Sequence, residues 1–249
     1  MTLQGKVALI TGSSRGLGRA IALRFAQQGA DLVINYARDA AAAGDVQAQA
    51  SAAGVKAIAV QADVSTSDGV EHLFRTALDT FGRLDVVVAN AGIEKVNIPV
   101  TDITEEDFDL LLRVNTKGPF LVLRAAARHI ADGGRIINVA SSTTQFPAVG
   151  IGLYGTSKVA PTYLVQVLAK ELGSRGVTVN SLIPGAIDDA GIFDGVPDAD
   201  PFKTDLRESV PLGRLATTTD VADVAELLAD PKAAFVTGQN ILMNGGSNQ

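Results

Sequence analysis

Short apolar runs alternate with helical patterns along nearly the whole chain, and this alternation limits the possible folds more than any other feature. The runs are rich in Val and Ile and mostly apolar throughout, which is typical of strands buried on both faces. In order they read KVALIT, DLVINY, KAIAVQAD, LDVVVANAG, RIINVAS, VTVNSLIPG and QNILMNGG. Strands that alternate with helices through right-handed crossovers form a doubly wound parallel sheet. We therefore predict one α/β domain over residues 1–249.

The segments between these runs carry the spacing and the end signals of helices. Residues 17–25 and 70–81 keep apolar side chains at helical spacing, and a glycine follows each segment closely. Residues 39–53 are rich in alanine, the strongest helix former. Thr104 and Asp107 have the spacing of a capping box, which predicts another helix start.

Composition excludes several classes of function. The chain has no cysteine, which excludes disulfides, thiolate chemistry and cysteine-ligated metals. The two histidines, His72 and His129, lie far apart, so we predict no metal site. The formal net charge is -6, and no basic run is interleaved with aromatic residues, so we expect no nucleic-acid partner. No apolar run approaches about 18 residues, and we expect a soluble cytoplasmic protein without membrane contact.

A glycine-rich turn follows the first apolar run. The stretch ALITGSSRGLGRAIA passes from strand to helix through Gly12, Gly16 and Gly18. Glycines let the backbone turn tightly and approach a ligand closely, and the helix start presents free N–H groups to an anion. After the first strand of a doubly wound pattern, this turn favours a dinucleotide site. The glycines alone would also fit a turn that binds nothing.

The end of the second apolar run bears on the choice of cofactor. An NAD site has a carboxylate there for the ribose hydroxyls, whereas an NADP site has a cation for the 2′-phosphate. Here Tyr36 occupies the place of the acid, Arg38 follows, and Arg15 lies within the glycine turn. Asp39 is better explained as a cap of the next helix. We therefore favour NADP(H) over NAD(H), although both arginines could equally be surface charges.

The stretch LYGTSKVAP places a tyrosine four residues before a lysine. This spacing puts Tyr154 and Lys158 on one face of a helix. The pair by itself does not indicate chemistry, because tyrosine and lysine meet at this spacing on many solvated helices.

Taken together and in order, these motifs resemble those of the short-chain dehydrogenase/reductase family, in its compact single-domain type, over nearly the whole chain. The resemblance implies a Rossmann-type fold of about seven strands with helices on both faces, and a homotetramer or homodimer. It is carried by Thr11-Gly12-Ser13-Ser14-Arg15-Gly16-Leu17-Gly18, Asp63-Val64, Asn90-Ala91-Gly92, Asn115 in VNTKGPF, Ser141 in NVASS, Tyr154 to Lys158, and Pro184-Gly185.

The resemblance implies four catalytic residues. Tyr154 would be the general acid in reduction and the general base in oxidation. Lys158 would lower the tyrosine pKa through its charge and bind the nicotinamide ribose. Ser141 would hold the substrate oxygen, with Ser142 as the alternative, and Asn115 would hold a water on a proton path.

The resemblance also implies a cofactor site. Asp63 and Val64 would contact the adenine, residues 90–92 would line the cofactor backbone, and the turn at 184–187 would face the carboxamide. The complete expected set is Gly12, Ser14, Arg15, Gly16, Leu17, Gly18, Tyr36, Arg38, Asp63, Val64, Asn90, Ala91, Gly92, Tyr154, Lys158, Pro184, Gly185 and Ile187.

Two features depart from the family pattern. Pro161 stands where a small residue is usual, and it has no N–H to donate to the Ser157 carbonyl, so we expect a local bend in the helix. Asp188 and Asp189 follow Ile187, where the family often has threonine.

The substrate is expected to be a small free ketone or alcohol. Residues 186–212 are rich in Gly, Pro and Asp, and we predict a substrate lid with apolar contacts from Ile192 and Phe193. The chain is similar to 3-oxoacyl-acyl-carrier-protein reductases, and Arg175 matches one rim cation of a carrier site. Asp132 replaces a second such cation, however, and the acidic lid disfavours large anionic partners. A sugar or polyol dehydrogenase and a non-catalytic NADP-binding redox sensor remain the alternatives.

Overall fold

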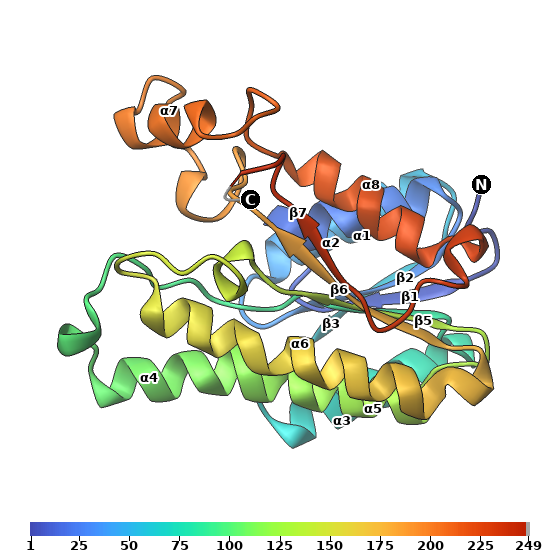
Figure 1. Ribbon diagram of the computed structural model, residues 1–249. Coiled ribbons are helices and arrows are strands. Elements are labelled where there is room, and N and C mark those ends of the chain that lie inside the picture. The colour runs from blue at the N-terminus through green and yellow to red at the C-terminus, as the bar shows by residue number, and fades with distance from the viewer. Residues whose placement is uncertain (248–249) are drawn as a thin grey trace.

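The predicted sheet is present in the computed structural model, which describes residues 1–247 (Figure 1). All seven strands are parallel, in the order β3-β2-β1-β4-β5-β6-β7. They are β1 Val7–Ile10, β2 Asp31–Tyr36, β3 Ala57–Gln61, β4 Val86–Ala89, β5 Arg135–Val139, β6 Thr178–Pro184 and β7 Asn240–Met243. Each lies within one of the apolar runs, so the prediction of a doubly wound sheet is confirmed.

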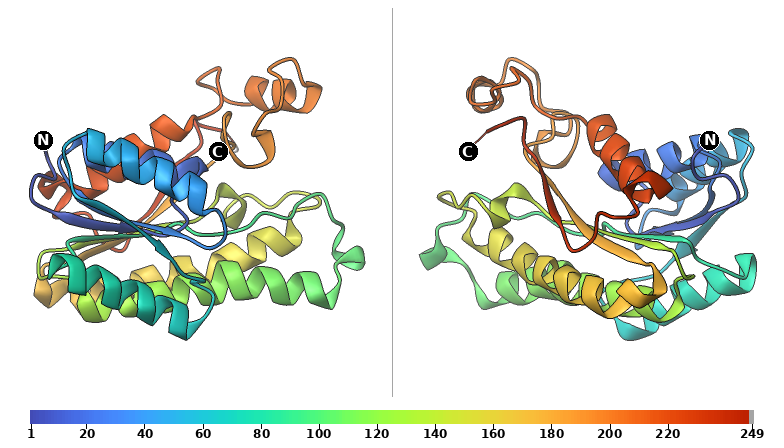
Figure 2. Two further views of the ribbon diagram at one scale, coloured as in Figure 1. Left: turned by 180° about the vertical axis from the view of Figure 1, so that it is seen from behind. Right: turned by 45° about the vertical axis from the view of Figure 1, so that its right-hand side comes forward.

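Helices cover both faces of this sheet, as Figure 2 shows from two further sides. One face carries α1, α2 and α8, and its core contains Phe25, Val46 and Val221. The other carries α3, α5 and α6, and its core contains Phe74 and Leu123. The helices are α1 Gly16–Gln27, α2 Ala40–Ala52, α3 Ser67–Phe81, α4 Glu105–Leu112, α5 Gly118–His129, α6 Gly152–Leu172, α7 Pro201–Glu208 and α8 Thr218–Ala229. Among residues 1–247, no helix is both long enough and apolar enough to cross a membrane.

The strand order reverses direction between β1 and β4, which pair directly with each other. The chain leaves β1 toward one side of the sheet and β4 toward the other, so a crevice opens at their carboxyl ends. The glycine turn follows β1 and residues 90–92 follow β4, and the fold therefore brings both segments to this crevice.

The expected helix caps are present, with one correction. Asp39 caps α2 by accepting the N–H of Ala42 at 2.9 Å, as predicted. Thr104 caps α4 by accepting the N–H of Asp107 at 3.1 Å. The capping box expected there is only half formed, because the Asp107 carboxylate pairs with the ammonium group of Lys95.

The predicted lid, residues 186–212, contains more regular structure than its composition suggested. It holds a 3₁₀ turn, η5 (Gly191–Phe193), and the helix α7. Asp200 caps α7 and Pro201 is its first residue, so the start of this helix does carry a signal in the sequence. Phe193 is buried with Val210 and Leu215 in a small core of the lid, so its predicted role as a substrate contact is wrong in this conformation.

Helix α6 runs through Pro161 without a break. The Ser157 carbonyl, which Pro161 cannot pair, instead accepts the hydroxyl of Thr116 at 2.7 Å. Thr116 lies in a π-helical turn, η2 (Arg113–Lys117), between α4 and α5. The Thr116 side chain, from the turn between α4 and α5, thus supplies the hydrogen bond that the proline removes, and α6 remains continuous.

This replacement can be tested by a double-mutant cycle. Thr116→Val leaves the Ser157 carbonyl without a partner and should lower the free energy of unfolding by about 1–2 kcal/mol. In a Pro161→Ala background, the new N–H reaches that carbonyl, so the same change should cost about 1 kcal/mol less. Urea unfolding of the four proteins measures the difference, and equal costs in both backgrounds would contradict this account.

Candidate active site

The glycine turn leaves room and N–H groups for an anion. Gly12 and Gly16 have φ of +61° and +52°, in the left-handed region that favours glycine. A Cβ on Gly18 would lie 2.4 Å from the Gly12 carbonyl oxygen and 2.5 Å from Nδ2 of Asn90. Arg15 is the N-cap of α1, and its side chain makes no capping hydrogen bond. The first N–H groups of α1 are therefore available to a phosphate.

Two asparagines hold this turn in place. Asn90 donates from Nδ2 to the Thr11 carbonyl at 2.9 Å. Asn35 accepts the Gly12 N–H at 3.1 Å and donates to the Ala62 carbonyl at 3.1 Å, which joins the ends of β1, β2 and β3. Sequence reasoning missed Asn35, although a lone amide within the apolar run DLVINY was a signal for such a role.

The two arginines expected near an adenosine phosphate are exposed. Neither Arg15 nor Arg38 forms an ion pair within residues 1–247. Asp63 accepts the N–H of Ser65 at 2.9 Å, and its hydrogen bonds with Ser65 hold the pKa of its carboxyl below the usual value, with smaller contributions from Arg113 and Arg38. Tyr36, at the end of β2, carries no charge that would repel a phosphate.

Asn115 clamps the chain where it leaves β4. It accepts the N–H of Ile93 at 2.9 Å and donates to the carbonyl of Ile93 at 2.8 Å. It also donates to Oγ of Ser157 on α6 at 3.0 Å. A Cβ on Gly92 would lie 3.0 Å from Nζ of Lys158 and 3.1 Å from Oδ1 of Asn115. Two of the expected catalytic residues, Asn115 and Lys158, therefore meet beside the exposed backbone of Gly92.

Lys158 is buried below this point. Its ammonium group donates to the Val139 carbonyl at 3.4 Å and lies 5.9 Å from the centre of the Tyr154 ring. Burial lowers the pKa of Lys158 to about 8, and the negative charge of Glu94 opposes this shift.

Tyr154 differs from expectation in the direction of its pKa shift. The sequence predicted that the charge of Lys158 lowers the tyrosine pKa. In the structure, burial raises the pKa of Tyr154 above its usual value of 10.0, the charge of Glu94 adds to the rise, and only a hydrogen bond with Ser141 lowers it. The expected lowering is therefore wrong for the chain without a bound ligand, because burial disfavours the charge that each of the two side chains would carry.

Ser141, rather than Ser142, is the serine beside Tyr154. It hydrogen-bonds with Tyr154, and its Oγ accepts the hydroxyl of Thr143 at 3.0 Å. Ser142 lines a separate pocket with Gly185 and Met243. The spacing argument that favoured Ser141 in the sequence agrees with this arrangement.

The two acids that depart from the family pattern fasten the lid and α8. Asp188 pairs with Lys203 of α7 at 3.2 Å, and only 3% of the Lys203 side chain is exposed. Asp189 accepts both the N–H and the hydroxyl of Thr218 at 2.8 Å, at the start of α8. The turn at 184–187 is held by the N–H of Gly185, which donates to the Met243 carbonyl at 2.8 Å.

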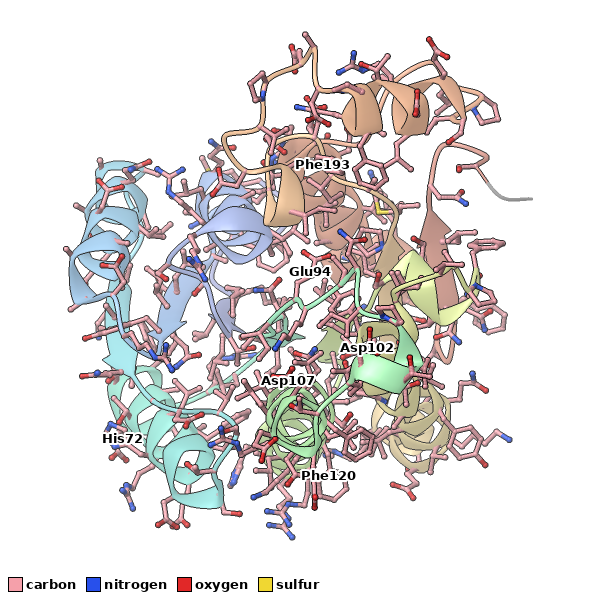
Figure 3. The ribbon with its side chains drawn as sticks, turned by 90° about the vertical axis from the view of Figure 1, so that its left-hand side faces the viewer. His72, Glu94, Asp102, Asp107, Phe120 and Phe193 are labelled. Carbon is pink, nitrogen blue, oxygen red and sulfur yellow. The ribbon has the colours of Figure 1, made fainter. Side chains whose placement is uncertain are left out.

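The remaining candidate residues have structural roles. Arg175, the expected rim cation, pairs with Asp132 at 2.8 Å and donates to the Ala127 carbonyl near the end of α5 at 2.8 Å. His129 packs against Phe74, and no group of metal-ligating side chains occurs in the part of the chain that the structure describes. Figure 3 views the molecule from the side of the crevice, where Glu94 lies between the lid residue Phe193 and the helix residue Asp107.

Known proteins match this chain in sequence and in fold. Residues 12–248 match the family model described as Enoyl-(Acyl carrier protein) reductase. The chain is 38% identical over 257 residues to a hydroxynaphthalene reductase-like protein of Metarhizium brunneum. This match covers 99% of this chain and 96% of that protein. It is also 39% identical over 255 residues to versicolorin reductase of Emericella nidulans, and this match covers 98% of this chain and 96% of that protein. A crystal structure of a short chain dehydrogenase from Burkholderia cenocepacia in complex with NADP has a TM-score of 0.93 and 36% identity, with 100% of both chains covered.

The close approach at Gly18 predicts that this position tolerates no side chain. Gly18→Ala should lower the free energy of unfolding by about 1–3 kcal/mol, because backbone atoms must shift to admit the Cβ. It should also weaken binding of NADPH, measured by the cofactor's fluorescence. Gly44→Ala is the matched control, since nothing lies within 4 Å of its Cβ position in α2. That change should be neutral or stabilise by about 0.5–1 kcal/mol, and equal effects at the two positions would refute the steric argument.

Proposed function

Since the chain belongs to the short-chain dehydrogenase/reductase family, whose members act on alcohol and carbonyl groups, we propose that it reduces the carbonyl group of a small ketone with NADPH. Oxidation of a secondary alcohol is the reverse reaction. The observation that carries this proposal is a connected set of contacts among the four expected catalytic residues. Lys158 and Asn115 lie beside the exposed backbone of Gly92. The ammonium group of Lys158 lies 5.9 Å from the centre of the Tyr154 ring, and Tyr154 hydrogen-bonds with Ser141.

The residues present fit a nicotinamide dinucleotide. The free N–H groups at the start of α1 suit its pyrophosphate, and the bare backbone of Gly92 beside Lys158 leaves room for its nicotinamide ribose. The expected contacts of Ser14 and Leu17 in the turn, Val64 at the adenine, Ala91 along the cofactor backbone and Ile187 at the carboxamide belong to the same proposal. When bound, this cofactor supplies a hydride to the carbonyl carbon.

In this proposal Tyr154 donates a proton to the carbonyl oxygen, and Ser141 donates a hydrogen bond to the same oxygen. The Tyr154 phenol is protonated at neutral pH, as a general acid must be, although burial raises its pKa and so makes it a weaker acid. Lys158 brings a positive charge toward the developing alkoxide. Asn115 keeps Ile93 and Gly92 in the position that the reaction needs.

The role of Tyr154 predicts the effect of removing its hydroxyl. Tyr154→Phe should lower kcat for ketone reduction by about 10²–10⁴-fold, the usual range for a general acid, and leave the Kd for NADPH unchanged. The loss of absorbance at 340 nm with a panel of ketones measures the rate. A wild-type protein that binds NADPH tightly and consumes none with any ketone would instead support a cofactor-binding sensor.

We further propose that NADP(H) is preferred over NAD(H). Support comes from Arg15 and Arg38, exposed cations at the position expected for a 2′-phosphate, and from the use of Asp39 as a helix cap. The NADP complex of the Burkholderia relative is consistent with this choice.

This preference predicts a cofactor-specific loss. Arg38→Ala and Arg15→Ala should each raise the KM for NADPH by about 10-fold or more and leave the KM for NADH unchanged, because only NADPH carries the extra phosphate. Arg19→Ala is the control, since that arginine points to Asp45 at 3.5 Å on the neighbouring helix. A wild type that uses NADH better than NADPH would overturn the assignment.

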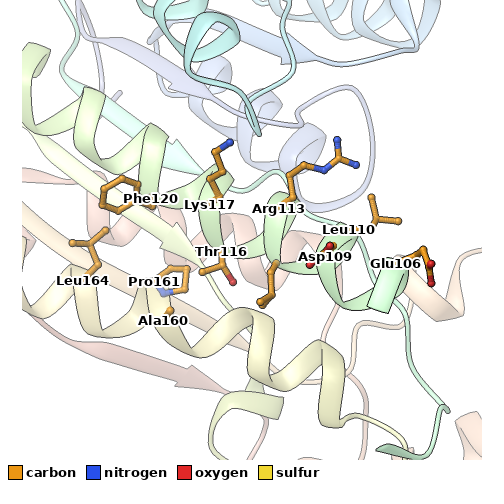
Figure 4. Close-up of a pocket in the computed structure, with 11 residues that line it drawn as sticks. Glu106, Asp109, Leu110, Arg113, Thr116, Lys117, Phe120, Ala160, Pro161 and Leu164 are labelled. Atoms are coloured by element: carbon orange, nitrogen blue, oxygen red, sulfur yellow. The ribbon is translucent and has the colours of Figure 1, made fainter. Parts of the chain in front are cut away.

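A groove between α4, α5 and α6 supports the proposal of a homo-oligomer (Figure 4). It has a volume of about 950 Å³, and Phe120, Leu110 and Pro161 are among its lining residues. Phe120 is 44% exposed, and Tyr163 and Val159 on the next helix are also exposed. We propose that a second copy covers this face and that the edge strand β7 completes a homotetramer.

The groove predicts how assembly can be broken. Phe120→Glu places a charge on the covered face and should shift the mass measured by light scattering to a smaller species. Glu71→Gln, on the exposed side of α3, should leave the mass unchanged. A wild-type protein that is monomeric at micromolar concentration would contradict the proposed interface.

A further inference from the structure

Glu94 follows Gly92 by two residues, its charge acts on Tyr154 and Lys158, and it has no place in the proposed chemistry. Its backbone follows Ile93, which Asn115 holds through both its N–H and its carbonyl. Gly92, two residues earlier, is the residue whose Cβ position lies 3.0 Å from Nζ of Lys158. The position of Glu94 is therefore set by the same contacts that set the catalytic pair.

The Glu94 carboxylate reaches from this centre to the lid. Its Oε2 lies 3.0 Å from the position that a Cβ on Gly191 would occupy, and the backbone of Ile192 contributes a hydrogen bond to it. In Figure 3, Glu94 lies between the lid residue Phe193 and the helix residue Asp107. A substrate held between the catalytic pair and the lid would lie against this carboxylate.

The carboxylate is not neutralised by an ion pair. No cationic side chain of residues 1–247 forms a salt bridge with Glu94, and the adjacent Lys95 pairs with Asp107 instead. The side chain is exposed, yet enough protein surrounds it for desolvation to raise its pKa, and Lys158 and Ile192 oppose the rise. Its negative charge acts on both Tyr154 and Lys158.

A carboxylate of this kind selects by hydrogen bonding. It accepts hydrogen bonds and donates none, so it favours a ligand with an O–H or N–H group and repels an anion. An ammonium group on the ligand would approach the buried charge of Lys158, which disfavours a cationic substrate. What remains is a neutral substrate with a hydrogen-bond donor close to the reacting carbon, and a hydroxyl group is the simplest such donor on a ketone or alcohol substrate.

We propose that Glu94 is a substrate-binding residue that accepts a hydrogen bond from a hydroxyl next to the reacting carbonyl, so that the preferred substrates are hydroxyketones and the corresponding vicinal diols. This inference rests on the proposed ketone reduction. It shifts the substrate class from simple ketones toward polyol-like compounds, and it names the residue responsible.

A matched pair of ketones tests the proposal. 1-Hydroxy-2-propanone and 2-butanone have nearly the same size and differ by a hydroxyl in place of a methyl group. The ratio of their kcat/KM values is measured with NADPH for the wild type, Glu94→Gln, Glu94→Leu and the control Glu71→Gln. The ratio cancels any general effect of the Glu94 charge on Tyr154 and Lys158, because that effect acts on both ketones equally.

The proposal predicts that Glu94→Leu lowers the ratio by about 10- to 100-fold, the size expected for a hydrogen bond to a charged group. Glu94→Gln keeps a neutral acceptor and should lower the ratio less, and Glu71→Gln should leave it unchanged. The Kd for NADPH should be the same in all four proteins. An unchanged ratio in both Glu94 variants would overturn the proposal, as would a loss confined to NADPH affinity.

Failure of the proposed function would look different. In that case the wild type consumes NADPH with neither ketone, and the same two compounds are compared as ligands through the melting temperature of the NADPH complex. A shift that requires the hydroxyl and disappears in Glu94→Leu still supports the role of Glu94. Equal shifts with both compounds overturn it.

Discussion

Two hydrogen bonds between Asn115 and the backbone of Ile93 hold together the parts of the molecule that form the crevice. Ile93 belongs to the chain leaving β4, whereas Asn115 belongs to the turn between α4 and α5. A third hydrogen bond from Asn115 reaches Ser157 on α6, and the Ser157 hydroxyl in turn donates to the Tyr154 carbonyl at 2.7 Å. One buried amide therefore fixes three parts relative to one another: the chain leaving β4, the turn between α4 and α5, and α6, which carries Tyr154 and Lys158. Such a fully satisfied polar network specifies a single arrangement.

The π-helical turn at Arg113–Lys117 makes this connection possible. In a regular helix, two adjacent residues point in directions about 100° apart. Here Asn115 and Thr116 both contact Ser157, one at its hydroxyl and the other at its carbonyl. The carbonyl is free because Pro161 cannot pair with it. Pro161, which departs from the family pattern, is thus matched by the Thr116 hydroxyl in the turn packed against α6. π-Helical turns of this kind occur frequently at functional sites.

The sheet was predictable from sequence because its signals are local and periodic, whereas the four candidate catalytic residues were expected only from the resemblance to the family. Val86 to Ala89 is a short valine-rich run of the kind typical of a buried parallel strand, and the glycines of the first turn indicate a tight strand-to-helix connection by their spacing. The direction of the Tyr154 pKa shift was not predictable, because it depends on burial and on Glu94, which is distant in sequence. The roles of Phe193 and Glu94 were also hidden. No pattern distinguishes a phenylalanine that packs in the lid from one that faces a ligand, or a loop glutamate at the cleft from one in solvent.

The central claim is that the amide of Asn115 holds the reactive arrangement around Gly92. The most direct measurement is NADPH consumption by Asn115→Leu, a variant of similar volume that has no hydrogen-bonding group, with its fold checked by circular dichroism. The account predicts a folded protein with a lowered melting temperature and a turnover reduced by at least about 100-fold. A folded variant with wild-type turnover would contradict it, because the site would then be held together without the interaction on which this description depends.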